Sequence, residues 1–267
     1  MSCELNQELS SELVTHNSTP VTPAALSVEN LVAGYPGRVL VRNLFLCVPA
    51  PAFVAVVGHK GSGKTTLFRV LTGQLPYQGR VRLHGQEVHD LRRAASAGLL
   101  GYLPQRGSID FAIAVRELVV MGRYRHHGLL SAYAPADYAL ADAALVLVGM
   151  AHLAARDFTQ LSGGEQQLVW LAQLSLQDAQ AYLLDEPTQQ LDVYYRRQVF
   201  ALMHSWVTQH GKTVLCSTHD LDNLPELSGY LLNLSEPEPE LRIISPASVR
   251  EARAWLEQAP VSIKNQK

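Results

Sequence analysis

Short apolar runs alternate along this chain with segments in which apolar side chains recur every three or four residues. The runs predict strands at residues 25–32, 39–48, 53–57, 80–84, 99–103, 181–184 and 213–217. A helix is predicted before the last run, because Val199, Leu202 and Trp206 share one helix face. The first two runs follow each other directly and predict an N-terminal antiparallel β subdomain. The later alternation predicts an α/β fold with a mostly parallel core sheet.

The middle of the chain has a helical pattern instead. Helices are predicted at residues 115–121 and 137–148, with a loop between them that contains residues 123–127. We expect roughly residues 110–178 to form a helical subdomain inserted into the sheet domain. The last helix is predicted to start near Ser245-Pro246, because serine is a good N-cap and proline fits the first turn.

The first 24 residues are polar, and they lack the basic and apolar regions of a signal peptide. We expect residues 1–24 to form a disordered extension. No stretch approaches the roughly 20 apolar residues that a membrane-spanning helix needs. A protein of this kind would work at a membrane only through partners.

The composition excludes several classes of protein. A net charge of -2 in 267 residues gives no basic surface for wrapping nucleic acid. Cys3, Cys47 and Cys216 are far apart and form no CxxC pair, so neither a disulfide framework nor a zinc site is predicted. A reducing cytoplasm is the natural setting for such a chain.

Residues 58–65 fit the pattern G-x-x-x-x-G-K-[ST], which is typical of a phosphate-binding loop. Glycines let successive backbone N–H groups point into one concavity, and the helix that follows adds its positive dipole end. Lys64 would neutralise the β- and γ-phosphates, and the Thr65 hydroxyl would bind Mg²⁺. A chance glycine turn is the alternative, which the apolar run 53–57 before it and the helix predicted at 64–71 disfavour. The predicted phosphate contacts are Gly58, Gly61, Ser62, Gly63, Lys64, Thr65 and Thr66.

An apolar strand ends in two adjacent carboxylates, Asp185 and Glu186. Asp185 would hold the Mg²⁺ shell, and Glu186 would polarise the attacking water as a general base. Neighbouring side chains of a strand point to opposite sides, so the two carboxylates suit two different tasks. Alone, such a pair is most often an ordinary strand end. In a chain with a phosphate loop, we interpret it as functional.

Residues 161–167 read Leu-Ser-Gly-Gly-Glu-Gln-Gln, a glycine-rich turn that opens a helix. Ser162 and Glu165 have the spacing of a capping box, which by itself explains both residues. Gly163 and Gly164 in a first helical turn destabilise the helix by roughly 1 kcal/mol each relative to alanine. Such a loss is understandable where a ligand must approach the backbone closely. We therefore predict a second phosphate contact here.

Three single residues carry weaker signals. Gln105 follows the predicted strand 99–103 and would reach Mg²⁺ or the attacking water. His219 follows the run 213–217 and would hydrogen-bond the γ-phosphate, whereas Tyr35 would stack on an adenine ring. Each residue has a plainer alternative, namely a solvated glutamine, a structural histidine and a packed tyrosine.

Taken in order, these segments resemble the nucleotide-binding subunit of ATP-binding cassette (ABC) transporters over about residues 26–246. Each segment matches one family motif, with the A-loop at Tyr35, Walker A at residues 58–66, the Q-loop at Gln105, the signature at 161–167, Walker B at 183–186, the D-loop at Leu191 and Asp192, and the switch histidine at His219. The resemblance implies a P-loop (RecA-like) core and one nucleotide-binding domain over residues 25–267.

The resemblance also implies a mechanism. The cofactors are ATP and Mg²⁺, and two copies form a head-to-tail homodimer with ATP between the Walker A loop of one and the signature of the other. Thr65, Gln105 and Asp185 would hold the metal. Glu186 and His219 would set up hydrolysis, with Gln105 beside them. In the family pattern Ser162, Gly163, Gly164 and Asp192 contact the nucleotide.

The implied partners are integral membrane permease subunits and a periplasmic or lipoprotein substrate-binding protein, and nucleic acid is not among them. The chain would then lie on the cytoplasmic side of the inner membrane, held there by the permease. Several positions depart from the common family pattern, which leaves the hydrolysis rate and interface electrostatics open. These departures are His59, Lys60, Leu168, Gln173, Gln189 and Gln190.

The substrate class rests on a softer resemblance. Residues 115–124 and 127–131 are similar to segments of bacterial importers of iron chelates, haem and cobalamin. Zinc and manganese importers have similar segments, including a Pro-Gln-Arg like residues 104–106. The transported molecule never touches this subunit, so no residue of this chain recognises it. On the segment resemblance, a metal-chelate importer is favoured and a metal-ion importer comes next.

Other functional classes remain as alternatives. Soluble ABC ATPases of DNA repair and chromosome structure insert coiled coils or zinc modules, for which the interval between Gln105 and Ser162 is too short and lacks CxxC pairs. Translation factors carry two cassettes, whereas this chain carries one. A single-cassette scaffold ATPase for iron–sulfur assembly stays open. A P-loop kinase would lack the signature at 161–167.

Overall fold

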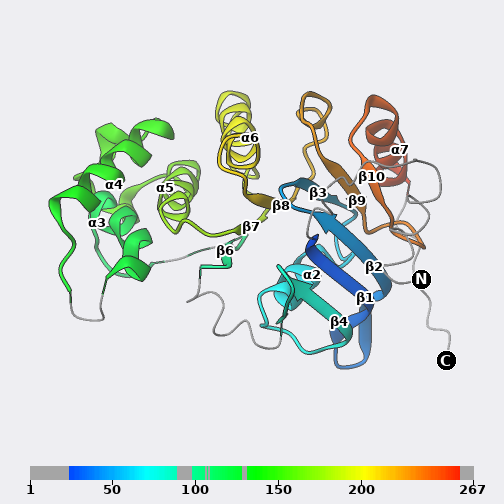
Figure 1. The fold of residues 1–267 in the computed structure, drawn as a ribbon. Helices are drawn as coiled ribbons and strands as arrows, with labels where there is room; N and C mark the ends of the chain where they lie inside the picture. The colour runs from blue at the N-terminus through cyan, green and yellow to red at the C-terminus, as the bar shows by residue number, and fades with distance from the viewer. Residues whose placement is uncertain (1–23, 89–97, 106, 108, 128–130, 259–267) are drawn as a thin grey trace, which may run out of the picture. The chain divides into compact units, whose positions relative to one another are not determined.

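The computed structural model describes residues 24–88, 98–105, 107, 109–127 and 131–258. The chain divides into two compact units, unit 1 within residues 1–91 and 224–267 and unit 2 within residues 92–223 (Figure 1). The extension predicted at residues 1–24 lies outside the described residues except for Ala24. The domain boundary at residue 25 and the helical subdomain at 110–178 stay predictions.

The first part of unit 1 is an antiparallel sheet in the strand order β2-β1-β4-β5. Strand β1 (Ala24–Tyr35) pairs on one side with β2 (Arg38–Pro49) and on the other with β4 (Tyr77–Leu83), and β4 also pairs with the two-residue β5 (Gln86–Glu87). The antiparallel pairing predicted for the first two strands is confirmed. Both strands are longer than the sequence pattern indicated.

Buried and exposed side chains alternate along strand β2, so one face of the sheet is buried and the other is exposed. Leu44, Leu46 and Val48 are buried, whereas Phe45 and Cys47 between them are exposed, as the two-residue period of a strand requires. Cys47 is disulfide-bonded, although its distance in sequence from the other cysteines indicated no disulfide. Separation along the chain does not measure distance in space. Cys216 is free and buried.

The second part of unit 1 contains parallel strands. Strand β3 (Phe53–Val57) is fully buried, which explains its continuous apolar sequence, and it pairs in parallel with β9 (Tyr230–Asn233). Strand β10 (Leu241–Ile243) pairs with β9 in the antiparallel sense. Helix α2 (Lys64–Leu71) follows β3 after one turn. The bounds predicted for β3 and α2 are confirmed.

Helix α7 (Pro246–Glu257) ends the described part of unit 1, after the short 3-10 helix η5 (Leu224–Glu226). The Ser245 hydroxyl accepts a hydrogen bond from the Ser248 backbone N–H, and proline occupies the first turn. This start matches the prediction from serine and proline.

Unit 2 contains three parallel strands in the order β6-β7-β8. They are β6 (Leu100–Leu103), β7 (Ala181–Asp185) and β8 (Thr213–Ser217), and the last two are fully buried. Helix α6 (Val193–Thr208) connects β7 to β8 and buries the predicted face with Val199. The register places Asp185 beside Ser217, so the carboxyl ends of β7 and β8 meet.

The helices α3 (Val115–Val120), α4 (Pro135–Leu147) and α5 (Gly163–Ser175) group together within unit 2 (Figure 1). Short 3-10 helices η3 (Ala151–Leu153) and η4 (Phe158–Gln160) lead from α4 to α5. The helices predicted at residues 115–121 and 137–148 correspond to α3 and α4, and their bounds differ from the prediction by at most two residues.

The loop predicted at residues 123–127 is wrong for most of its length, because a 3-10 helix η2 (Met121–His126) continues α3. Gly122 explains this difference. A Cβ atom at Gly122 would lie 2.2 Å from the Gln173 carbonyl oxygen, so the backbone packs directly against α5. Tertiary packing of this kind orders a segment whose polar sequence indicates a loop.

The described chain combines an antiparallel sheet, parallel strands and intervening helices, so the α/β fold prediction is confirmed. Among the described residues, no helix is long and apolar enough to cross a membrane.

Candidate nucleotide-binding and catalytic site

The predicted phosphate loop follows β3 in unit 1 and curls through backbone angles that favour glycine. The φ angles of Gly58, Gly61 and Gly63 are +151°, +85° and +102°. A Cβ atom at Gly58 would lie 2.4 Å from the Ser62 hydroxyl oxygen. The conformation therefore favours glycine at all three positions, and at Gly58 the space requires it as well. The loop ends where α2 begins.

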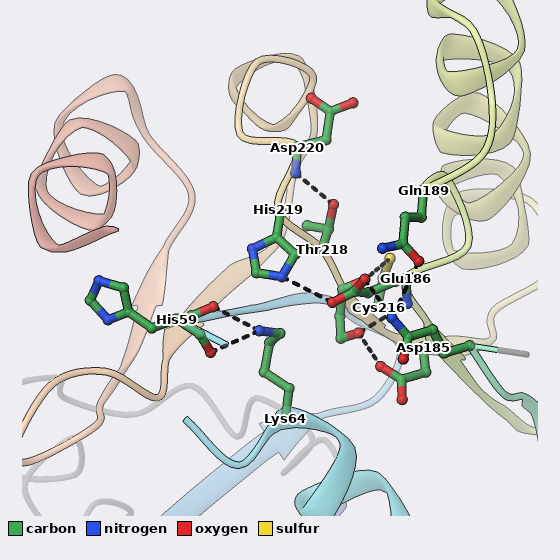
Figure 2. Close-up of polar contacts among 12 residues, drawn as sticks. His59, Lys64, Asp185, Glu186, Gln189, Cys216, Thr218, His219 and Asp220 are labelled. Atoms are coloured by element: carbon green, nitrogen blue, oxygen red, sulfur yellow. Dashed lines mark hydrogen bonds and ion pairs between the residues drawn. The ribbon is translucent and has the colours of Figure 1, made fainter. Parts of the chain in front are cut away.

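The side chain of Lys64 stabilises the loop through hydrogen bonds to the loop backbone. Its side chain is only 6% exposed, and Nζ donates hydrogen bonds to the carbonyl oxygens of Gly58 at 2.7 Å and His59 at 3.3 Å (Figure 2). The loop therefore forms a curl around the ammonium group. The Ser62 hydroxyl is buried and, among the described residues, has no hydrogen-bond partner. A phosphate oxygen would suit this unused donor.

His59 connects the same loop to residues near the end of the described chain. Its backbone N–H donates to the Ser235 hydroxyl at 2.8 Å, and its ring Nε2 lies 3.0 Å from the carbonyl oxygen of Gln258. A carbonyl only accepts hydrogen bonds, so Nε2 carries the proton in this contact. The His59 side chain thus holds the loop to the end of α7.

Tyr35 lies at the end of β1 in a tight hairpin, where it pairs with Arg38. The Arg69 guanidinium donates to its hydroxyl at 2.8 Å and lies 6.0 Å from the ring centre. The ring is partly exposed and near α2, the helix that follows the phosphate loop. Its stacking on adenine stays a prediction.

The carboxylate of Asp185 lies at the end of β7 in unit 2 and is 1% exposed. The Ser217 hydroxyl donates a short hydrogen bond to Oδ1. The other oxygen, Oδ2, is buried and has no hydrogen-bond partner within the described chain. An unpartnered buried carboxylate oxygen suits a cation or a water of its shell.

Glu186 is turned away from the strand by its backbone. Its φ is +53°, and its N–H donates to the Ser217 carbonyl and hydroxyl oxygens at 3.1 and 3.0 Å. Such a left-handed conformation in a residue other than glycine is strained and persists where neighbours impose it. Its carboxylate consequently contacts different groups from those that contact Asp185.

Both carboxylate oxygens of Glu186 have side-chain partners. Oε1 lies 2.9 Å from Nε2 of His219 (Figure 2). Oε2 accepts a hydrogen bond from Nε2 of Gln105 at 2.9 Å. Because a carboxylate only accepts, His219 presents an N–H to it. Because both of its oxygens are held, the carboxylate has a fixed orientation from which it can accept a proton from water. The structure thus brings together Gln105, Glu186 and His219.

The residues predicted for Mg²⁺ are one hydroxyl, one amide and one carboxylate, from Thr65, Gln105 and Asp185. Among the described residues, no group of three or more His, Cys, Asp or Glu side chains could hold a metal ion. Mg²⁺ typically uses one or two protein oxygens and takes its other ligands from phosphates and water. The unpartnered Oδ2 of Asp185 is the observation that supports the fit.

The predicted signature begins helix α5 with a complete capping box. Ser162 Oγ accepts from the Glu165 N–H at 3.4 Å, and Glu165 Oε2 accepts from both the hydroxyl and the N–H of Ser162 at 2.7 Å. These bonds, first from the hydroxyl and then from the backbone, lower the pKa of Glu165 below its ordinary value. The capping box prediction is confirmed.

A hollow of about 540 Å³ opens at the start of α5. It is lined by Gly163 and Gly164 and by Asp192, whose carboxylate caps α6 by accepting from the Tyr195 N–H at 2.9 Å. Two helix N-termini therefore border one concavity, an arrangement that favours an anion. Gln190 partly covers it, because a Cβ atom at Gly163 would lie 2.2 Å from Gln190 Oε1.

The predicted residues thus fall into three groups. The phosphate loop and Tyr35 belong to unit 1, whereas the Glu186 group and the signature hollow belong to unit 2. The roles assigned to them stay predictions. Ser217 was not predicted as a site residue, although the end of a strand parallel to β7 was a signal for it. Gln189 was predicted only as a departure from the family pattern. No pattern indicated Ser235.

Comparison with known proteins identifies the family. Residues 41–189 match the protein family described as ABC transporter. The chain belongs to the ABC transporter family. It is 35% identical over 212 residues to the manganese transport system ATP-binding protein MntB of Bacillus subtilis, covering 78% of this chain and 82% of that protein. It is also 36% identical over 199 residues to the achromobactin transport ATP-binding protein CbrD of Dickeya dadantii, covering 74% of each chain.

Solved structures agree with this assignment. An inward-facing ABC transporter described as of the metal-chelate type matches with a TM-score of 0.71 and 29% identity, over 87% of this chain and 88% of that one. A dimeric bacterial ABC transporter cassette matches with a TM-score of 0.73 at 22% identity, over 82% of this chain and 98% of the cassette, which supports the fold alone. As a member of this ABC family, the chain is an ATP-binding protein and an ATPase.

Proposed function

We propose that the chain powers an importer of a metal chelate, such as siderophore-bound iron, haem or cobalamin. The catalytic part of this proposal rests on one observation, namely that both oxygens of the Glu186 carboxylate are held by His219 and Gln105. The transport part rests on relatives whose names concern achromobactin, iron(3+)-hydroxamate and cobalamin.

In the proposed mechanism, the loop at residues 58–66 binds the triphosphate through Lys64 and backbone N–H groups. Bound Mg²⁺, held by Thr65, Gln105 and Asp185, would neutralise phosphate charge during the reaction. Glu186 takes a proton from the attacking water, and His219 keeps the carboxylate in position. No covalent intermediate is required, since catalysis consists of positioning and electrostatic stabilisation.

In the proposed assembly, two copies meet head to tail, and the signature hollow of one copy binds the phosphates held by the other. ATP contacts both copies only when they are closed, which is the differential affinity that can shift the population to the closed dimer. Permease subunits would hold the dimer at the cytoplasmic side of the inner membrane. A periplasmic or lipoprotein substrate-binding protein would deliver the chelate.

Manganese import is the second candidate, and the relative MntB is the observation that favours it. The ATPase subunit does not touch the transported molecule, so only uptake separates the two. Deletion of this chain in its own host should abolish uptake of an iron–siderophore complex and leave radioactive manganese uptake unchanged. Loss of manganese uptake alone would favour the second candidate, and loss of neither would exclude an essential role in importing either.

The same strain tests the catalytic assignment. Wild-type protein should restore uptake, whereas Glu186→Gln should not, because an amide cannot accept the proton. In purified form this variant should lose at least about 100-fold in kcat, since general base catalysis contributes roughly 10²–10⁴-fold. Full ATPase activity in Glu186→Gln would show that another group is the base.

A further inference from the structure

Gln189, which departs from the common family pattern, contacts the proposed catalytic group. It lies in the turn between β7 and α6, and its Oε1 accepts a hydrogen bond from Nε2 of Gln105 at 3.2 Å. The same Nε2 donates to Glu186 Oε2 at 2.9 Å. Figure 2 shows Gln189 beside Glu186. One amide nitrogen therefore joins Gln189 to the carboxylate.

The direction of these bonds follows from the carboxylate. An ionised carboxylate can only accept, so Gln105 must turn its NH₂ group toward Glu186. That NH₂ group has two hydrogens, and Gln189 takes the second one through its own carbonyl oxygen. With both hydrogens engaged, the amide of Gln105 is held in one orientation. Its carbonyl oxygen, the atom that can bind a cation, points to the other side.

The backbone holds Gln189 where this contact is possible. Its N–H donates to the Glu186 carbonyl oxygen at 3.2 Å, and the Leu191 N–H donates to the carbonyl oxygen of Thr188 at 3.2 Å. Thr188 is buried. The turn is therefore hydrogen-bonded directly to Glu186, the residue whose carboxylate accepts from the Gln105 amide. A serine or alanine side chain is too short to extend from this turn as the glutamine does.

We propose that Gln189 is a positioning residue for ATP hydrolysis, which orients the amide of Gln105 between the base and the cation. This inference rests on the proposed roles of Gln105 and Glu186. Gln189 acts through Gln105 and does not itself touch the reacting atoms. Its removal should therefore impair turnover while leaving nucleotide binding nearly unchanged.

The test uses Gln189→Met, which keeps the length of the side chain and removes the acceptor. We expect kcat to fall about threefold to tenfold, the range for one hydrogen bond of ordinary strength, with the KM for ATP changed less than twofold. Gln209→Met is the control, because Gln209 is an exposed glutamine at the end of α6. This control should keep wild-type kcat and the same thermal unfolding midpoint as Gln189→Met.

A double-mutant cycle separates positioning from a general effect on the turn. If Gln189 acts through Gln105, Gln189→Met should cause no further loss in a Gln105→Ala background. An equal loss in both backgrounds would overturn the inference, because it would place the effect in the turn. Wild-type activity of Gln189→Met, with Gln105→Ala and Glu186→Gln impaired, would overturn this inference alone. Full activity of Gln105→Ala would instead remove the role proposed for Gln105 and the inference with it.

Discussion

Gly58 combines a special backbone conformation with a close contact inside the phosphate loop. Its φ of +151° disfavours residues with a side chain, and a methyl group would meet the Ser62 hydroxyl at 2.4 Å. We expect Gly58→Ala to weaken ATP binding at least tenfold, because alanine is strained at this φ angle and its methyl group would displace the Ser62 side chain. Binding of a fluorescent ATP analogue measures the affinity, and thermal unfolding measures the stability. The strained backbone should destabilise the folded state by about 1–3 kcal/mol.

Gly211→Ala is the matched control for backbone strain. Gly211 also has a positive φ, +64°, but no atom lies within 4 Å of its added Cβ. This variant should lose some stability and keep wild-type affinity for the analogue. If both variants bound ATP equally well, the tight curl of residues 58–63 would have no part in nucleotide binding.

At the scale of the element, the N-terminus of α5 depends on an ionised side chain. The pKa of Glu165 is lowered from its ordinary value of 4.5 by the hydroxyl and backbone N–H of Ser162. The carboxylate therefore stabilises the folded state fully above pH 4.5, and this contribution disappears as pH falls through the lower folded pKa.

We expect wild-type protein to be more stable than Glu165→Gln at neutral pH, by at most about 1 kcal/mol for an exposed carboxylate in a first turn. The difference should shrink below pH 4.5, because protonation removes the charge that glutamine lacks at every pH. Denaturant unfolding of both proteins across pH 3–7 measures it. A difference that stayed constant over this range would mean that the charge contributes nothing.

Elements with a continuous apolar run or a well-capped start were predictable from the sequence. The apolar runs gave the bounds of β3 and β8 directly, and the serine–proline pair gave the start of α7. The strands β5, β9 and β10 were not predicted, and none of them is longer than four residues. The 3-10 helix η2 was missed because its order comes from packing against another helix.

The candidate site could be predicted only where its residues lie in continuous motifs. The phosphate loop and the signature lie in continuous motifs, so their spacing carries the information. Ser217 and Gln189 act through contacts with residues distant in sequence or through a turn, and only the fold brings these groups together. A sequence motif therefore identifies the groups that do chemistry more readily than those that orient them.

At the scale of the whole molecule, the proposed dimer assigns the two phosphate contacts of one ATP to different copies. Lys64 would act from one copy and Ser162 from the other. Lys64→Ala removes the charge inside the phosphate loop, and Ser162→Arg places a bulky side chain at the mouth of the signature hollow. Each variant alone forms dimers in which both sites are damaged, so each should be inactive. Unchanged thermal unfolding midpoints would show that both variants fold.

An equal mixture of the two inactive variants should recover ATPase activity. In a head-to-tail dimer, a mixed pair carries both damaged halves in one site and leaves the other site intact. About half of randomly formed dimers are mixed, so up to about a quarter of wild-type activity should return if the sites act independently. A Lys64→Ala and Ser162→Arg double variant mixed with Lys64→Ala is the control, because every pairing there lacks an intact site. With independent sites, failure to recover activity when the single variants are mixed would mean that the two residues serve the same copy, and it would exclude the head-to-tail arrangement as the source of catalysis.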